Sequence, residues 1–375
     1  MSTPSKQNIV IVGAGYAGLS AWIPLSTKLD AQKHTLVLIN PRPYFTHLPA
    51  ALRMATTAEG ALEDEILIPL SDAKYNTGNR KLIIAAVTSI VERGNEGGHL
   101  VLDSGETVEY SILILATGAL WDGPLALPNT KAEAVGVVTS WREKFAQAND
   151  IVLVGGGSVG LELAGEIKDL SLNKNVTVVH AKSQLLNDTY PDSWRTYVGK
   201  QFASRGVKLV LGDYVDDLEI REGHIKTRSS KSIKADLVVP TRGGSPNTKF
   251  IESLGGDVVT PSGTVKVVPT LQIAGHPRIF AAGDIIAWDE QKQAAKTPNH
   301  AIVVVHNTLV LLGLSKKAVI PYKGSTELIL ITNGKYGGTG YFQILWGISI
   351  GNWLSSLLKS KSLLVDATKK TLQLA

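Results

Sequence analysis

Two glycine-rich turns stand where they could bind phosphate groups. The first, Gly13-Ala14-Gly15-Tyr16-Ala17-Gly18, follows the apolar run 9–12, and the second, Gly155-Gly156-Gly157-Ser158-Val159-Gly160, follows the run 151–154. Glycines at this spacing allow a tight turn and a close approach to a pyrophosphate, which the N-terminus of the next helix then binds. One such motif is weak evidence, but two in strand–turn–helix context predict two dinucleotide sites. A chain with two dinucleotides most simply passes electrons between them.

The ends of the two following strands lack the acidic residue that often binds an adenosine ribose. The run 35–39 ends in Asn40-Pro41-Arg42, where Asn40 can bond a ribose without charge and Arg42 can accommodate a phosphate or stack on adenine. This pattern is compatible with FAD. The run 175–180 ends in His180-Ala181-Lys182. A basic end favours the 2′-phosphate of NADPH, so we predict Lys182 as a ligand, with NADH and NADPH both left open.

Further short motifs follow apolar runs along the chain. They are Ala116-Thr117-Gly118, Thr241-Arg242-Gly243 and Gly283-Asp284. Small residues at a strand end let the backbone approach a ligand closely, so Gly243 and the other small residues are candidates for cofactor contact. The segment 297–301 opens an apolar helix that reaches about residue 312, with Thr297 as the expected N-cap and Pro298 at its first position.

The remaining pattern predicts the elements that position these motifs. Helices are expected over 19–29 and 141–147, a hairpin over 322–341, and strands over 83–91, 99–102, 111–115 and 235–240. The tail places six apolar residues at helical spacing, namely Trp346, Ile350, Trp353, Leu354, Leu357 and Leu358. This face could lie on a membrane or admit a quinone, or it could pack in the core or in a dimer.

Composition narrows the function classes. The 375 residues carry a net charge of +5 and contain no cysteine, which excludes disulfides, a cysteine redox relay and cysteine-ligated metals. We expect no metal site. The scattered basic residues make nucleic acid an unlikely partner. No apolar stretch approaches the ~20 residues of a membrane span, Ser2 argues against N-myristoylation, and no secretory signal is evident. The expected location is the cytoplasm, with possible peripheral contact to a membrane such as a lipid droplet or the mitochondrial outer surface.

The order of these motifs resembles the two-dinucleotide-binding-domain flavoproteins, which are related to the pyridine nucleotide-disulfide oxidoreductases. Within them it is most similar to the apoptosis-inducing-factor-like branch, which includes ferroptosis-suppressor-type quinone reductases. Residues 47–53, 155–168 and 281–284 carry the likeness. The resemblance implies FAD at Gly13, Ala14, Gly15 and Gly18, an isoalloxazine near Pro298–Ala301, and NAD(P)H on Gly155, Gly157 and Gly160. It also implies that Asp284 bonds the ribityl or phosphate region. Asn40, His180 and the absent myristoylation glycine depart from the family pattern.

Four features have two explanations each. Glu162 could face the nicotinamide–flavin contact or merely favour the helix dipole. Arg53 could bind the pyrophosphate or pair with a surface carboxylate. His300 could donate a proton to a reduced quinone or simply pack. The six apolar residues at helical spacing in the tail have the alternatives given above.

Together these features predict an α/β protein with two Rossmann-like domains, the second inserted in the first. We expect an FAD domain over 1–125 and 256–318, an NAD(P)H domain over 126–255, and a C-terminal interface segment over 319–375. The predicted activity is hydride transfer from NAD(P)H to FAD and on to an external acceptor, which we expect to be a quinone. Another small molecule or redox protein is one alternative acceptor. A different alternative is a death effector or DNA-binding protein that uses the fold as a scaffold. Either a monomer or a homodimer is compatible with the sequence.

Overall fold

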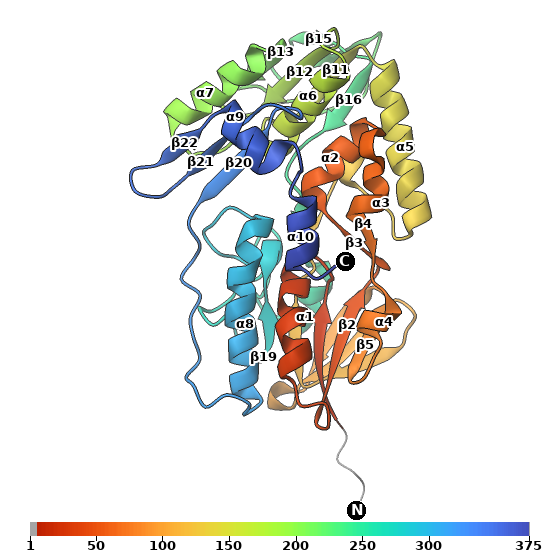
Figure 1. Cartoon of the computed structure of the whole chain (residues 1–375), viewed down its shortest axis with the longest axis vertical. Helices are drawn as coiled ribbons and strands as arrows, with labels where there is room; N and C mark the ends of the chain where they lie inside the picture. Colours follow the sequence, from red (N-terminus) through yellow and green to blue (C-terminus); the bar gives the residue numbers. More distant parts are fainter. Residues whose placement is uncertain (1–5, 375) are drawn as a thin grey trace, which may run out of the picture.

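The computed structural model describes residues 6–374, so Ser2 lies outside the described residues. It contains two α/β units and a C-terminal segment (Figure 1). The helices are α1 Tyr16–Lys28, α2 Leu48–Thr56, α3 Leu62–Ile66, α4 Asp72–Tyr75, α5 Lys131–Gln147, α6 Ser158–Leu170, α7 Asp192–Ala203, α8 Thr297–Leu311, α9 Asn352–Ser355 and α10 Val365–Thr371. The main strands are β1 Gln7–Val12, β2 His34–Asn40, β5 Arg80–Ile84, β9 Ile112–Leu115, β11 Asp150–Val154, β12 Asn175–His180, β13 Val207–Leu211, β16 Leu237–Pro240 and β19 His276–Ala281.

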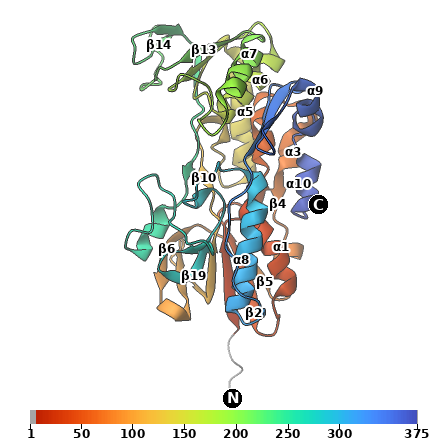
Figure 2. The same cartoon turned by 90° about the vertical axis from the view of Figure 1, so that its left-hand side faces the viewer.

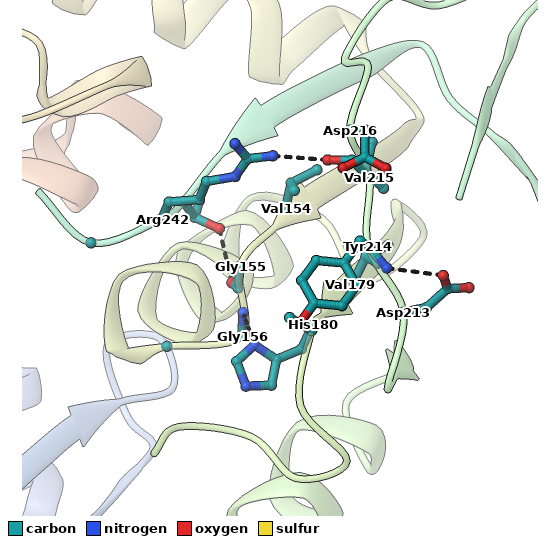
Figure 3. Close-up of a pocket in the computed structure, with 14 residues that line it drawn as sticks. Val154, Gly155, Gly156, Val179, His180, Asp213, Tyr214, Val215, Asp216 and Arg242 are labelled. Atoms are coloured by element: carbon teal, nitrogen blue, oxygen red, sulfur yellow. Dashed lines mark hydrogen bonds between the residues drawn. The ribbon is translucent and has the colours of Figure 1, made fainter. Parts of the chain in front are cut away.

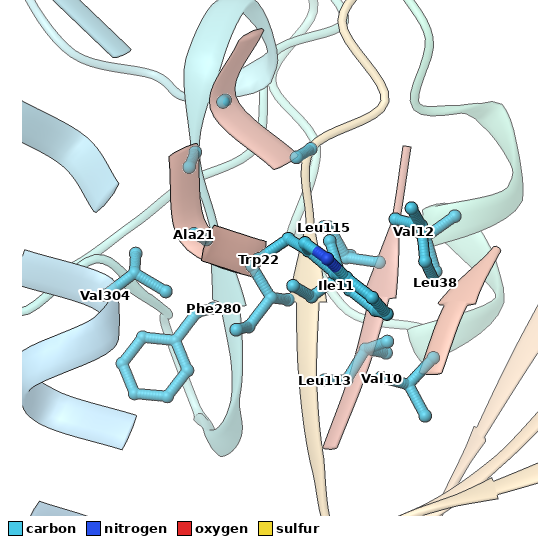
Figure 4. Close-up of a cluster of buried hydrophobic side chains, with 14 of the residues drawn as sticks. Val10, Ile11, Val12, Ala21, Trp22, Leu38, Leu113, Leu115, Phe280 and Val304 are labelled. Atoms are coloured by element: carbon cyan, nitrogen blue, oxygen red, sulfur yellow. The ribbon is translucent and has the colours of Figure 1, made fainter. Parts of the chain in front are cut away.

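The first unit is built on a six-stranded sheet in the order β18-β19-β9-β1-β2-β5, where β18 is Gln272–Ile273. The strands from β19 to β5 run parallel, and β18 is antiparallel to β19. The β1 strand lies inside the sheet, so its run 9–12 is buried on both faces as a parallel strand requires. Trp22 of α1, Phe280 of β19 and Val304 of α8 pack around it (Figure 4).

This sheet is covered differently on its two faces. Helices α1 and α8 pack together on one face, and the small antiparallel sheet of β6 Val87–Glu92, β7 Gly98–Leu102 and β8 Thr107–Tyr110 lies on the other (Figure 2). The prediction of one strand over 83–91 is wrong. The chain leaves the main sheet after β5 and enters the small sheet at β6, because Ala85 N–H bonds Asn40 O while Ala86 O accepts from Asp103 N–H.

The second unit is a four-stranded parallel sheet, β13-β12-β11-β16. It is inserted between β9 and β19 of the first sheet, and its two connections pair as β10 Ala119–Leu120 with β17 Ser245–Pro246. The predicted helix 141–147 is the end of the longer α5. Thr130 caps its start: the Thr130 Oγ1 accepts from Glu133 N–H at 3.3 Å and donates to Glu133 Oε2 at 2.7 Å.

The C-terminal segment confirms the predicted hairpin, as β20 Leu328–Thr332 pairs with β21 Gly338–Phe342. The prediction that the six apolar residues of the tail share one helix is wrong. Trp346 lies in a turn and Ile350 ends β22 (Ile348–Ile350), so only the residues from Trp353 onward are helical, in α9 and the π-helical turn Ser356–Ser360. Backbone pairing of β22 with β21 explains why the helical spacing fails there.

The N-cap of helix α8 is not Thr297, as the sequence predicted. Lys296 is the N-cap residue, and Thr297 is already helical, with its hydroxyl donating to Ala294 O at 2.8 Å. Pro298 is the second residue of the helix, one position later than predicted, and still lies in its first turn. Among residues 6–374, no helix has the length and apolar character that crossing a bilayer requires.

Candidate active site

A central cavity of about 340 Å³ lies where the two units and the C-terminal segment meet. The cavity is lined by the first glycine turn, the ends of β2 and β9, the Gly283 turn, and residues from α2, α6 and the tail. Its lining residues are Gly13, Ala14, Gly15, Tyr16, Ala17, Asn40, Arg42, Tyr44, Thr46, Leu48, Pro49, Leu52, Ala116, Thr117, Gly118, Ala119, Trp121, Leu125, Val159, Glu162, Gly283, Asp284, Lys292, Gln293, Ala294, Thr297 and Lys359.

The first glycine turn has the geometry of a phosphate cradle. Gly13 has φ +106°, and a side chain there would collide with Ala116 O. Gly18 does not line the cavity: a Cβ on it would lie 1.8 Å from Gly13 O, so this glycine lets α1 approach the turn. Gly15 has open space at its Cβ position. The N-terminus of α1 therefore faces the cavity with unobstructed backbone.

The polar lining fits a flavin dinucleotide. Thr46 Oγ1 and Gln293 Oε1 are buried without a hydrogen-bond partner in the described chain, and both residues line the cavity. Buried polar atoms without a partner are costly, so they mark positions where a bound molecule would bond. Arg42 donates to Leu127 O at 2.6 Å, and Asn40 holds the turn by accepting from Ala14 N–H at 2.9 Å.

Asp284 and Lys292 form the polar side of the cavity near β19. Burial raises the pKa of Asp284, and the nearby Lys292 and His300 oppose that rise. Burial also lowers the pKa of Lys292, which donates to Trp288 O at 3.0 Å. Two buried ionisable groups with shifted pKa values are typical of a functional site.

Glu162 enters the cavity from α6 and meets the C-terminal segment. Its Oε1 accepts from Lys359 Nζ at 2.6 Å and from Thr332 N–H at 2.9 Å. Lys359 also donates to Leu330 O at 2.8 Å. Both side chains are only 13% exposed. Glu162 therefore lines the cavity where the two units and the C-terminal segment meet, and its role toward the nicotinamide–flavin contact stays a prediction.

Of the two explanations for His300, the geometry favours packing over proton donation. His300 is buried and does not line the cavity; its Nδ1 accepts from Gly283 N–H at 3.0 Å. Its Nε2 therefore carries the proton and donates to Glu290 Oε1 at 2.8 Å. Tyr322 donates to the other oxygen of Glu290. His300 thus fixes the Gly283 turn from behind, the packing alternative that the sequence left open.

Three other predicted ligands lie away from the cavity wall. Arg53 pairs with buried Glu166 through two 2.8 Å bonds, since both groups come from helices packed face to face. Pro298 is exposed and Ala301 is buried within α8, and neither lines the cavity. The residues that reach it are Thr297 and the segment 292–294, because the chain enters α8 past the cavity before the helix turns away.

A second cavity of about 490 Å³, the peripheral cavity, lies at the strand ends of the inserted unit (Figure 3). Three of the predicted ligands line it, namely Gly155, Gly157 and Gly243. Gly155 has φ +134°. Gly160 lies behind, where a Cβ would be 1.9 Å from Gly155 O. The other lining residues are Val154, Gly156, Val179, His180, Ala181, Asp213, Tyr214, Val215, Asp216, Thr241 and Arg242.

Lys182, predicted as the ligand of a 2′-phosphate, does not line this cavity. Its ammonium pairs with Asp188 at 2.9 Å, and half of its side chain is exposed on the outer surface. Lys182 lies in the bend that follows β12, beyond the end of the strand. His180, two residues earlier, lines the cavity instead.

The sequence analysis missed the ligands supplied by distant segments. Lys292, Gln293 and Lys359 carry no local motif, and only the fold brings them to the first glycine turn. Tyr214–Asp216 follows β13, the strand beside β12, which is a position that a Rossmann strand order places near the adenosine end. That segment could have been found from the strand order.

Two glycine cradles at the ends of two parallel sheets define a flavoprotein with two dinucleotide sites. The model of the pyridine nucleotide-disulphide oxidoreductase family matches residues 7–306. The chain belongs to that family. FAD and NAD(P)H are its cofactors, and it is an FAD-dependent oxidoreductase.

Known relatives agree with this assignment. The chain is 46% identical over 321 residues to the FAD-dependent oxidoreductase FVFD30 of Flammulina velutipes, covering 84% of this chain and 98% of that one. It is 28% identical to the ferroptosis suppressor protein 1 of Taeniopygia guttata, covering 99% and 97%. The apoptosis-inducing factor homolog B of Dictyostelium discoideum is 27% identical, with coverage of 97% and 96%.

Solved structures share the fold. The sulfide:quinone oxidoreductase of Aquifex aeolicus superposes with a TM-score of 0.77 at 18% identity, covering 98% of this chain and 92% of that one. Putidaredoxin reductase in its covalent complex with putidaredoxin gives 0.69 at 20% identity, with coverage of 90% and 81%.

Proposed function

We propose that the chain is an NAD(P)H:quinone oxidoreductase, with FAD in the central cavity and NAD(P)H in the peripheral cavity. The observation that carries the proposal is the composition of the central cavity. The cavity is lined both by the first glycine turn and by Val159 and Glu162, which come from the helix that follows the second turn. A nicotinamide extending from the second cradle along α6 would therefore reach the flavin. FAD supplies hydride acceptance and two-electron transfer there.

The protein's own part is positioning and charge. Gly13 and Gly283 bring backbone against the cofactor, and His300 holds the Gly283 turn. Reduction of a quinone by NAD(P)H consumes one proton beyond the transferred hydride. Lys359 replaces His300 as the donor of that proton, because its ammonium lines the cavity and is held by Glu162. The absence of cysteine from the chain leaves direct transfer between the organic groups.

An apolar acceptor is supported by the surface next to the cavity. The C-terminal segment exposes several large apolar side chains immediately before Lys359: Ile344, Leu345, Trp346, Ile348, Trp353, Leu357 and Leu358. Trp346 is 97% exposed and Trp353 78%. We name these seven residues the tail face. Tryptophan and leucine at this density are typical of a surface that rests on a lipid interface. A lipid-soluble quinone would then enter beside Lys359.

The acceptor is tested by steady-state assays of the holoenzyme with NADH and NADPH. A long-chain ubiquinone in vesicles, menadione, ferricyanide and a ferredoxin are compared as acceptors. We expect both quinones to be reduced. Turnover confined to ferricyanide or to the ferredoxin would overturn the quinone assignment. The exchange of Lys359 for Met should lower kcat with quinones much more than with ferricyanide, which takes electrons without protons, whereas the exchange for Arg should preserve the ion pair.

A further inference from the structure

The peripheral cavity lacks the carboxylate that selects an unphosphorylated adenosine ribose. His180 ends β12, where that acid would stand. Its Nδ1 accepts from Gly156 N–H at 3.1 Å and its Nε2 donates to Leu186 O at 3.2 Å. Burial lowers the pKa of this imidazole. His180 is therefore neutral, with both nitrogens engaged, and contributes no charge toward a ribose substituent.

The two carboxylates that do line the cavity are engaged elsewhere. Asp213 accepts from Tyr214 N–H, Ser229 N–H and the Ser229 hydroxyl. Asp216 takes two hydrogen bonds from Arg228, at 2.6 and 2.9 Å. Asp216 is therefore paired with Arg228, which does not line the cavity, and Arg242 also helps to lower the pKa of Asp216. The acceptor positions of Asp213 are partly filled by neutral donors.

Arg242 is the only basic side chain, apart from the neutral His180, among the described residues lining the cavity. It is exposed, and its one hydrogen bond in the described chain goes to Val215 O at 2.8 Å. No carboxylate lies within ion-pair distance of it among residues 6–374. A guanidinium has five N–H donors in a planar fork, so most of them remain available for a phosphate.

The direction of the Arg242 side chain indicates which phosphate of a dinucleotide it could bind, the pyrophosphate or a 2′-phosphate on the adenosine ribose. A dinucleotide pyrophosphate lies at the N-terminus of α6, above β11, and the adenosine lies toward β12 and β13. Arg242 follows β16, on the other side of β11, but its side chain extends to the loop after β13 (Figure 3). The guanidinium is therefore on the adenosine side of the cavity.

We propose that Arg242 binds the 2′-phosphate of the adenosine ribose and makes NADPH the preferred reductant over NADH. This inference rests on the assignment of the peripheral cavity to NAD(P)H, but not on the nature of the acceptor. It moves the selective charge from Lys182, which is paired with Asp188 on the outer surface, to a residue after β16.

The test is calorimetric binding of two nucleotide fragments to the holoenzyme, with no acceptor present. The probes are adenosine 2′,5′-bisphosphate and adenosine 5′-monophosphate. A charge-assisted hydrogen-bond pair predicts that the bisphosphate binds about 10- to 100-fold more tightly. Arg242→Gln should abolish most of this preference and leave the monophosphate affinity unchanged. Arg242→Lys should retain part of it, and Lys182→Gln all of it. Retained flavin absorbance reports that each variant is folded.

The contrary outcomes are distinct. Equal loss for both probes in Arg242→Gln would mean that Arg242 serves the 5′-phosphate, and the proposal would fall. Loss of the preference in Lys182→Gln would return the role to that residue. If neither fragment bound the wild-type holoenzyme, the assignment of the cavity to a nucleotide would itself be wrong, whatever the quinone assays show.

Discussion

The buried His47 connects the first glycine turn with the C-terminal segment through hydrogen bonds to both. His47 Nε2 donates to Leu363 O at 2.6 Å, because a carbonyl can only accept. Its Nδ1 therefore accepts from the hydroxyl of Tyr16, at 2.5 Å. Tyr16 lines the central cavity, so His47 positions that ring and the tail together.

This histidine makes stability depend on pH. Burial lowers the pKa of His47 to about 4, whereas an unfolded histidine titrates near ~6.5. Between these values the unfolded chain binds the proton and the folded chain does not. The free energy of unfolding should therefore fall as the pH drops through this window, by up to about 3 kcal/mol. Urea unfolding across that range measures it.

The variant His47→Gln should lose this part of the pH dependence. The matched control is His224→Gln, on an exposed hairpin, which should keep the wild-type slope. Equal slopes for wild type and His47→Gln would show that His47 does not contribute to the pH dependence.

The buried pair of Arg53 and Glu166 gives the second prediction at this scale. Their side chains are 8% and 4% exposed, and burial raises the pKa of Glu166 although Arg53 opposes the rise. Arg53→Met leaves a buried carboxylate without its partner, so unfolding should become easier by about 3–5 kcal/mol. The control Arg93→Met breaks an exposed pair with Glu109 and should have a much smaller effect. Denaturant unfolding that gave equal losses would contradict this ranking.

At the scale of the element, the glycine turns set how closely a helix can approach its strand. A Cβ at Gly160 would lie 1.9 Å from Gly155 O and 2.8 Å from Thr241 Oγ1. Gly160→Ala should push α6 outward, destabilise the protein by about 1–3 kcal/mol and weaken NAD(P)H binding. Gly157→Ala meets open space at an ordinary φ of −79°, so its thermal stability should match the wild type. Thermal unfolding and NADPH titration of both variants distinguish the roles.

Helices and strands could be predicted from the sequence where a single local pattern determines them. The run 9–12 is buried on both faces of a parallel sheet, so its apolar continuity alone identifies it. The spacing of Thr130 and Glu133 is a helix-start signal in the sequence, and Thr130 caps α5. The tail failed because Trp346 and Ile350 match a helical period that pairing with β21 overrides. The spacing of apolar residues in the sequence does not show which strands will pair in the folded protein.

At the scale of the molecule, the active site is an assembly of parts that the sequence separates widely. The order of the motifs predicted two cradles and the insertion of one unit in the other. It did not predict that Lys359 meets Glu162, or that the Gln293 segment rather than Pro298 reaches the cavity, because these contacts depend on how the units pack. The prediction for Lys182 failed for a related reason, since the chain bends after β12 and Lys182 pairs with Asp188 on the surface.

The tail face gives the prediction that concerns the whole molecule. It joins the surface to the central cavity at Lys359, so removing its aromatic anchors should affect the delivery of a lipid-soluble acceptor and not the chemistry. The double variant Trp346→Ser, Trp353→Ser should bind anionic vesicles about tenfold or more weakly in sedimentation, because two large apolar side chains lose their burial in the interface. Its KM for a long-chain quinone in vesicles should rise, while kcat/KM for menadione in solution stays the same. The control Leu172→Ser removes a side chain that is 68% exposed in the turn after α6 and should behave as wild type. If the double variant bound vesicles as well as the control, the tail face would not be a membrane contact, and the route for the quinone beside Lys359 would lose its support.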